Sequence, residues 1–157
     1  MLASEIMASQ ADVRRIALSL PGAVEGDGHF AFAVPNQGKA KGFAWVWMER
    51  VVPKKPRVAN PAVLAIRVEG AEVKAMLLSS DEKKFFTEPH YQGFPAVLVR
   101  LAAIGAAELE ELLTQAWRCQ APRTVVEAFD AGRTASSRSR SSGKAKAPRR
   151  AAPKSRR

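Results

Sequence analysis

Three stretches of the chain place their apolar residues on one face of a helix. The first begins at the capping pair Ser9 and Asp12 and ends at Pro21. The second follows Gly70 and is expected over residues 71–78. The third has the clearest spacing, with apolar residues at i, i+3, i+4, i+7 and i+8, and stops before a proline. Its apolar positions are Leu109, Leu112, Leu113, Ala116 and Trp117.

Between the first two predicted helices the apolar spacing changes to that of β-strands. Phe30 and Phe32 alternate with small residues, and residues 63–68 alternate in the same way. Residues 35–42, PNQGKAKG, have the composition of a hairpin connection. After the second helix, residues 85–86 and 96–101 predict two further strands.

One predicted strand carries the large aromatic residues Phe43, Trp45 and Trp47 at alternating positions. Period-two spacing puts all three rings on one face of the sheet. We expect the helices to cover this row, because three amphipathic helices need a sheet face to pack on. An exposed platform on which unpaired bases stack is the alternative.

The alternation of elements predicts an α+β fold in which a mostly antiparallel sheet forms one of two layers and about three helices form the other. The chain has 157 residues, 46% of them hydrophobic, which fits one domain with an additional segment. We expect an N-terminal extension over 1–10, the domain over 11–132, and a tail over 133–157.

The tail holds the whole excess of positive charge. Residues 1–132 carry 15 basic and 15 acidic side chains, whereas the tail adds ten cations and no acid, giving the formal net charge of +10. Its remaining residues are mainly Ser, Ala and Pro, so we expect it to be disordered and to follow polyanions. The ten cations are Arg133, Arg138, Arg140, Lys144, Lys146, Arg149, Arg150, Lys154, Arg156 and Arg157.

Several classes of protein are disfavoured. There is no apolar run of spanning length and no export signal, so we expect a cytoplasmic protein that does not enter membranes. Cys119 has no second cysteine to pair with, and the two histidines, His29 and His90, have no ligand-like spacing. No phosphate-binding glycine loop or nucleophile–base pair is recognisable. We therefore expect no enzyme activity, metal, cofactor or small-molecule substrate.

Basic residues gather in two predicted connections of the sheet. Lys39 and Lys41 lie in the first, and Lys54, Lys55 and Arg57 lie between prolines in the second. Two such loops could straddle a duplex and contact its phosphates without reading bases. Chance enrichment of charge in exposed loops explains them equally well. Two further candidates for DNA contact are Arg100 and Arg123.

Three segments carry a resemblance to a known family. They are VRRIALSLP at 13–21, FFTEPHYQGFPAVLVRLAAI at 85–104, and the helix end AWRCQAP at 116–122. Together they resemble the MmcQ/YjbR family, over about residues 11–127. The long stretch 53–61 and the tail depart from the family pattern. The most specific positions of the resemblance are Pro89, His90, Tyr91, Gly93 and Pro95.

The resemblance implies a small α/β domain with a double-wing arrangement and a presumed DNA-binding role. For His90, a structural role in holding its loop is expected, with acid–base or switch chemistry as the alternative. The resulting hypothesis is a DNA-binding or other nucleic-acid-binding protein, nucleoid-associated and of low sequence specificity. The rival hypothesis is a protein-interaction or chaperone-like module whose tail serves solubility or localisation.

Overall fold

The computed structural model describes residues 7–28 and 30–144, and it describes residues 134–144 by their backbone alone. The chain divides into two units, Met1–Arg123 and Thr124–Arg157. The first unit holds the sheet and three of the helices.

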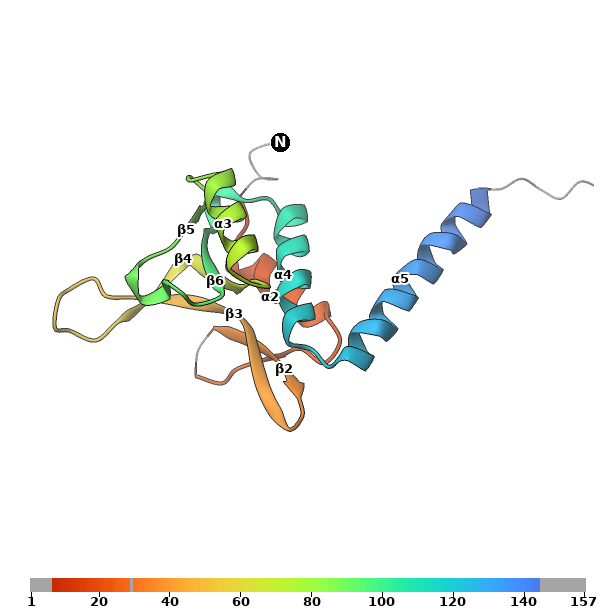
Figure 1. Ribbon diagram of the computed structural model, residues 1–157, viewed down its shortest axis with the longest axis horizontal. Coiled ribbons are helices and arrows are strands. Elements are labelled where there is room, and N and C mark those ends of the chain that lie inside the picture. The colour runs from red at the N-terminus through yellow and green to blue at the C-terminus, as the bar shows by residue number, and fades with distance from the viewer. Residues whose placement is uncertain (1–6, 29, 145–157) are drawn as a thin grey trace, which may run out of the picture. The chain divides into compact units, whose positions relative to one another are not determined.

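An antiparallel sheet forms the centre of the first unit, and its six described strands follow the order β1-β2-β3-β4-β6-β5 (Figure 1). Strand β4 pairs with β6 rather than with β5, although α3 and β5 lie between β4 and β6 along the chain. The strands are β1 (Val24–Glu25), β2 (Ala31–Asn36), β3 (Lys39–Glu49), β4 (Val58–Arg67), β5 (Phe85–Phe86) and β6 (Ala96–Arg100). The predicted α+β class with an antiparallel sheet is confirmed.

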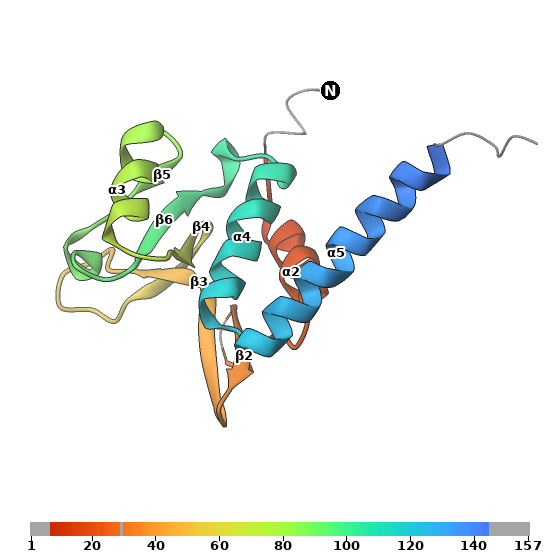
Figure 2. The same ribbon diagram turned by 45° about the vertical axis from the view of Figure 1, so that its right-hand side comes forward.

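Helices α2 (Gln10–Ser19) and α4 (Ala106–Gln120) lie side by side, and α4 contacts β2, β3 and β4 (Figures 1 and 2). Helix α3 (Ala71–Ser80) contacts the other end of the sheet at β5 and β6. The three helices stand where the apolar spacing predicted them. Two short 3-10 turns, η1 (Pro89–Tyr91) and η2 (Leu101–Ala103), flank β6.

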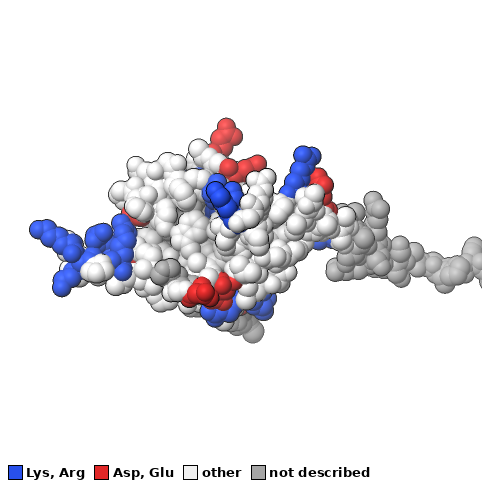
Figure 3. All heavy atoms as spheres, turned by 90° about the horizontal axis from the view of Figure 1, so that it is seen from below, with Lys and Arg blue, Asp and Glu red and all other residues white. Residues whose placement is uncertain are grey.

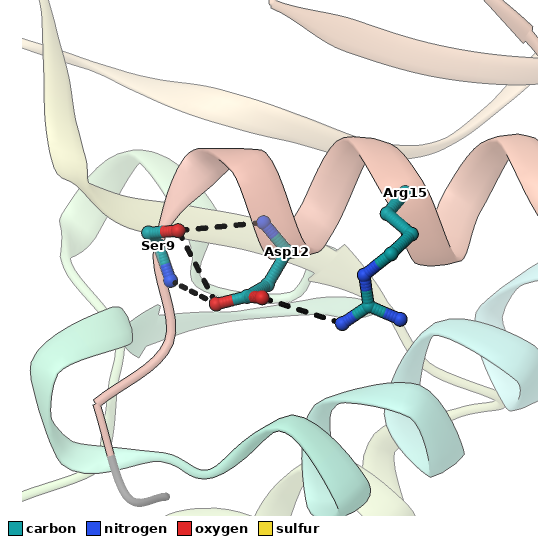
Figure 4. A network of polar contacts seen from close by, with 3 residues as sticks. All are labelled: Ser9, Asp12 and Arg15. Atoms are coloured by element: carbon teal, nitrogen blue, oxygen red, sulfur yellow. Dashed lines mark hydrogen bonds and ion pairs between the residues drawn. The ribbon is translucent and has the colours of Figure 1, made fainter. Parts of the chain in front are cut away.

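Helix α2 begins with the predicted capping pair (Figure 4). The Ser9 backbone N–H donates to Asp12 Oδ2 at 3.0 Å, and the Asp12 N–H donates to Ser9 Oγ at 3.4 Å. Arg15 Nη2 donates to Asp12 Oδ1 at 3.3 Å. These contacts lower the pKa of the Asp12 carboxyl, chiefly through the hydrogen bond from the Ser9 backbone.

The prediction that Phe43, Trp45 and Trp47 share one face of β3 is wrong for Phe43. A bulge opposite Phe32 and Ala33 pairs Ala44 with Phe32 and Gly42 with Ala33, so Phe43 is an extra residue. Phe43 and Ala44 are consecutive and both fully buried. The bulge therefore breaks the alternation, and Phe43 does not share a face with the tryptophans.

Trp45 and Trp47 pack in a second cluster rather than under the helices. They are half-buried against the buried residues Val63, Ala65 and Leu98. We call the rings gathered here the aromatic cluster. Its members are Trp45, Trp47, Phe86, Tyr91 and Phe94. A core role for the tryptophans is confirmed, and they pack on β4, on β6 and on the segment from Phe86 to Phe94.

Helix α5 (Arg123–Lys144) continues beyond the predicted domain boundary at Gly132. Residues 133–144 contain no proline, which permits a helix, although five Ser, one Thr and one Gly among them have low helix propensity beside three Arg, one Ala and one Lys. The predicted tail therefore starts inside a helix, and the compact first unit ends earlier than predicted, at Arg123. Residues 145–157, for which disorder was also predicted, lie outside the described part of the chain.

Candidate nucleic-acid interface

The connection between β3 and β4, residues 50–57, is the most basic segment of the first unit, and we call it the basic loop. Its sequence RVVPKKPR contains four cations and no acid. Figure 3 shows Lys and Arg side chains gathered at the end of the molecule that this connection occupies in Figure 1. The cations are Arg50, Lys54, Lys55 and Arg57.

Hydrogen bonds to the backbone hold the basic loop in one shape. Arg50 Nη1 donates to the Lys55 carbonyl at 2.7 Å, and Arg57 Nη1 donates to the Met48 carbonyl at 2.8 Å. The Lys55 N–H closes a turn on the Val52 carbonyl at 3.1 Å. A loop fixed in this way loses little entropy when it binds.

Arg50 was missed as a candidate in the sequence. Its position as the first residue after β3 and directly before Val51-Val52-Pro53 could have indicated it. Glu49, the acid next to it in the chain, accepts a hydrogen bond from Asn60 Nδ2 at 2.8 Å. This contact holds the one adjacent carboxylate on the strands at the base of the loop.

The second predicted basic connection, with Lys39 and Lys41, is the β2–β3 hairpin. Its turn uses left-handed backbone at Gln37 (φ 55°) and Gly38 (φ 80°). Asn36 Nδ2 donates to the Gln120 carbonyl at 2.9 Å, which fastens the hairpin to the end of α4. Both lysines are exposed.

The two basic connections stand at opposite ends of β3 (Figure 1). Strand β3 bends between them, so its ends lie closer than the roughly 30 Å spanned by a straight strand of 11 residues (Figure 1). The structure does not bring the two groups of cations together into one patch.

Arg100 and Arg123 lie away from both basic connections along the chain. Arg100 Nη1 donates to the carbonyls of Glu82 and Lys83 at 3.2 and 3.4 Å, and its guanidinium lies 4.1 Å from the Phe86 ring centroid. It thereby ties the segment after α3 to the sheet. Arg123 is exposed and opens α5.

The tail cations are divided by the limit of the described residues. Arg133 lies in α5 with its guanidinium 5.5 Å from the Phe129 ring centroid. Arg138, Arg140 and Lys144 also belong to α5. The remaining six lie outside the described residues: Lys146, Arg149, Arg150, Lys154, Arg156 and Arg157.

The motif positions from Pro89 to Pro95 form a loop that a buried lysine fastens. Lys74 on α3 is 9% exposed, and its Nζ donates to the carbonyls of Tyr91 at 2.5 Å and Phe94 at 2.8 Å. Burial lowers the pKa of this ammonium group. Gly93 has a left-handed φ of 78°, which suits glycine at this bend.

No sequence signal pointed to Lys74, because the apolar spacing of α3 predicts burial of its apolar residues, whereas Lys74 is its buried residue and Met76 is 60% exposed. Trp45 Nε1 on β3 donates a hydrogen bond to the Tyr91 hydroxyl at 3.1 Å, and this bond joins the loop to the sheet. The His90 backbone N–H donates to Glu88 Oε1 at 3.3 Å, while its exposed ring lies edge-on to Tyr91. The motif is thus built into the structure chiefly through Tyr91 and the loop carbonyls.

The described residues show no group of three or more metal-ligating side chains. Among the same residues, no helix has the length and apolar character needed to cross a membrane.

Partial burial raises the pKa of the Cys119 thiol, which makes the thiol a weaker nucleophile at neutral pH.

A groove of about 610 Å³ runs between α3 and α4. Val73, Leu77 and Leu112 contribute apolar surface, while Met76 is 60% exposed beside them. Charged residues of both signs also line it, including Arg67, Arg118, Glu69, Glu108 and Glu111.

No family model matches the chain. The chain is 36% identical over 132 residues to uncharacterized protein Rv2570 of Mycobacterium tuberculosis (strain H37Rv), a match that covers 78% of this chain and 96% of the relative. Uncharacterized protein Mb2600 of Mycobacterium bovis matches with the same identity and coverage. The chain belongs to the family of these mycobacterial proteins. Since the match covers nearly their whole length, the family shares the domain and not only one motif.

A solved structure has a fold similar to that of this chain. The crystal structure of protein DR2400 from Deinococcus radiodurans, a DUF419 domain, matches with a TM-score of 0.53 and 21% identity. The match covers 71% of this chain and 77% of that one. DUF419 belongs to the MmcQ/YjbR-like group, so the fold expected from the residue resemblance is the fold observed.

Proposed function

We propose that this protein belongs to the MmcQ/YjbR family and binds nucleic acid, mainly through the phosphate backbone and with low sequence specificity. The observation that carries the proposal is the basic loop, in which four cations and no acid occupy eight residues at the end of a β-hairpin. The likeness of fold to a DUF419 domain supports the family assignment, and the charge of the loop supports the partner.

The loop is suited to phosphate contact by its chemistry. Lys54 and Lys55 are exposed, and an ammonium group on a flexible stem meets a phosphate as a point charge. Arg50 and Arg57 each use one Nη1 donor to hold the backbone, which leaves the rest of a five-donor guanidinium for an anion. Contacts of these kinds position a protein on a duplex without reading its sequence.

The basic segment after Gly132 adds ten cations to the four of the loop. A second set of phosphate contacts on the same chain raises the effective concentration of the first set. We expect the segment to supply most of the affinity and the basic loop to supply the geometry.

The experiment is a fluorescence-anisotropy titration of the full chain with duplex DNA at several salt concentrations. Each phosphate contact contributes about 0.9 to the slope of log K against log salt. We expect the double variant Lys54→Gln/Lys55→Gln to reduce the slope by about 2. The control Lys83→Gln removes an exposed lysine after α3, outside the candidate interface, and is expected to leave the slope unchanged.

If Lys83→Gln reduces the slope as much as each lysine of the double variant does, the phosphate contacts are not confined to the basic loop, and the loop is removed from the proposal. No binding by the full chain at low salt would overturn the proposal as a whole.

The groove between α3 and α4 favours a second candidate, a protein-interaction module. Its apolar surface and mixed charges are suited to an amphipathic peptide helix. A Met76→Lys variant that loses a protein partner while keeping its affinity for DNA would favour this candidate.

A further inference from the structure

The basic loop also carries exposed aliphatic side chains, which phosphate binding alone does not use. Val51 and Val52 are 61% and 49% exposed, and Val58 at the start of β4 is 50% exposed. Adjacent apolar residues facing water within a cationic segment are suited to burial against a partner.

The tip formed by Val51, Val52 and Pro53 is held in a defined shape. The turn bond from the Lys55 N–H to the Val52 carbonyl closes it, and Lys54 takes a left-handed φ of 68° just after the proline. A non-glycine residue keeps such a backbone only where the surrounding contacts impose it. The valines are therefore presented at the loop end rather than free to fold back.

We propose that this tip is a wedge that enters the minor groove of duplex DNA, partly unstacks a base step and bends the duplex. The inference rests on the proposed function and deepens it by naming the form of DNA contact. Apolar side chains flanked by cations act in this way in minor-groove proteins, where the bend lets more phosphates reach the protein. Arg50, Lys54, Lys55 and Arg57 flank the tip within one or a few residues.

The observations favour DNA over an anionic lipid surface, although both attract cations. The tip has no Trp, Phe or Leu, the side chains that anchor interfacial segments, and two valines bury little area in a bilayer. A narrow turn with one cation directly before it and three after it in the chain can meet the phosphate rows that border a groove.

The experiment measures the bending of a short duplex, labelled at its two ends with a fluorescence resonance energy transfer pair, by the full chain. One duplex has a central TA step, which unstacks easily, and the other has a stiff A-tract. We expect the chain to bend the TA duplex and to bind it more tightly than the A-tract duplex.

The variant Val52→Ser keeps the turn, because only the backbone of Val52 takes part in it. We expect it to lose most of the bending and to bind the TA duplex about three- to tenfold more weakly, with the preference for TA removed. Val51→Ser is expected to act in the same direction. The matched control is Val24→Ser, a valine of similar exposure (47%) on β1, which should change neither quantity.

Two results would overturn the wedge and leave the proposed function standing. One is unchanged bending and binding in both Val51→Ser and Val52→Ser while Lys54→Gln/Lys55→Gln weakens binding. The other is valine-dependent binding to phosphatidylserine vesicles with no valine dependence on DNA, which would assign the tip to lipid. Absence of DNA binding by the full chain at low salt would overturn both proposals.

Discussion

The buried Lys74 fastens the loop from Pro89 to Pro95 to α3. Lys74 Nζ is the donor to two loop carbonyls, and a hydrogen bond to a charged group contributes more to stability than a neutral one. Replacing Lys74 by Met keeps the apolar stem and removes both donors. We expect the free energy of unfolding to fall by about 2 kcal/mol, measured by urea denaturation.

Amide hydrogen exchange should show faster exchange in residues 89–95 of Lys74→Met. The substitution Lys83→Met, at an exposed lysine, is the control and should leave both the free energy of unfolding and the exchange rates unchanged.

The pH dependence of stability provides a further check, because burial lowers the pKa of Lys74 below its ordinary value of 10.5. The stability due to this shift is largest above pH 10.5 and is lost as the pH falls through the folded-state pKa. Equal pH profiles for wild type and Lys74→Met would contradict this role.

Ser9, which caps α2, is expected to contribute measurably to stability. Ser9→Ala leaves the Asp12 N–H without its acceptor, so we expect a loss of about 1 kcal/mol in the free energy of unfolding. The comparison on the same helix is Ser19→Ala, whose hydroxyl donates to the Ile16 carbonyl in the last turn and makes no contact with the N–H groups of the first turn. Thermal denaturation followed by circular dichroism measures both, and an equal loss in the two variants would refute the capping role.

Helices were easier to predict than strand details, and the reason is physical. The cap at Ser9 and the spacing from Leu109 to Trp117 are local signals, so the helices could be placed from the sequence. The bulge that moves Phe43 off the tryptophan face depends on pairing with β2, which no local pattern contains.

For the candidate interface, too, local features could be predicted from the sequence and features that depend on the fold could not. The cations of the basic loop were visible as charge, but their separation from Lys39 and Lys41 follows from the antiparallel path of β3, which places successive turns at opposite ends. Lys74 could not be identified because its partners, Tyr91 and Phe94, lie 17 and 20 residues away.

Replacing a glycine by alanine is expected to have opposite effects in helix α5 and in the β2–β3 turn. Gly132 lies inside α5, where an added Cβ meets no atom within 4 Å, so Gly132→Ala should stabilise the helix by about 0.5–1 kcal/mol. Gly38→Ala also meets no neighbour, but its φ of 80° disfavours a side chain. We expect a stronger helical signal at 222 nm in the first variant and lower thermal stability in the second. An unchanged helical signal in Gly132→Ala would contradict the extension of α5 past the predicted boundary.

At the scale of the whole molecule, charge is distributed unequally between the two units. Thr124–Arg157 contains ten cations and two acids, whereas Met1–Arg123 contains 15 cations and 13 acids. Under the proposed function, the first unit would attract DNA through a local arrangement of charge, and the second through its net charge.

A chain ending at Gly132 separates the two kinds of attraction. It keeps the first unit and the basic loop, and it loses all ten tail cations. If all ten contacted B-DNA, their loss would reduce the salt slope by about 9, and partial engagement reduces it by less. We expect the shortened chain to bind duplex DNA much more weakly, with a slope no larger than about 4, the number expected from the cations of the basic loop. Fluorescence anisotropy from low to physiological salt measures both slopes. Equal slopes for the two chains would show that the basic segment makes no phosphate contact, because counterion release depends on the number of contacts and not on the net charge of the protein.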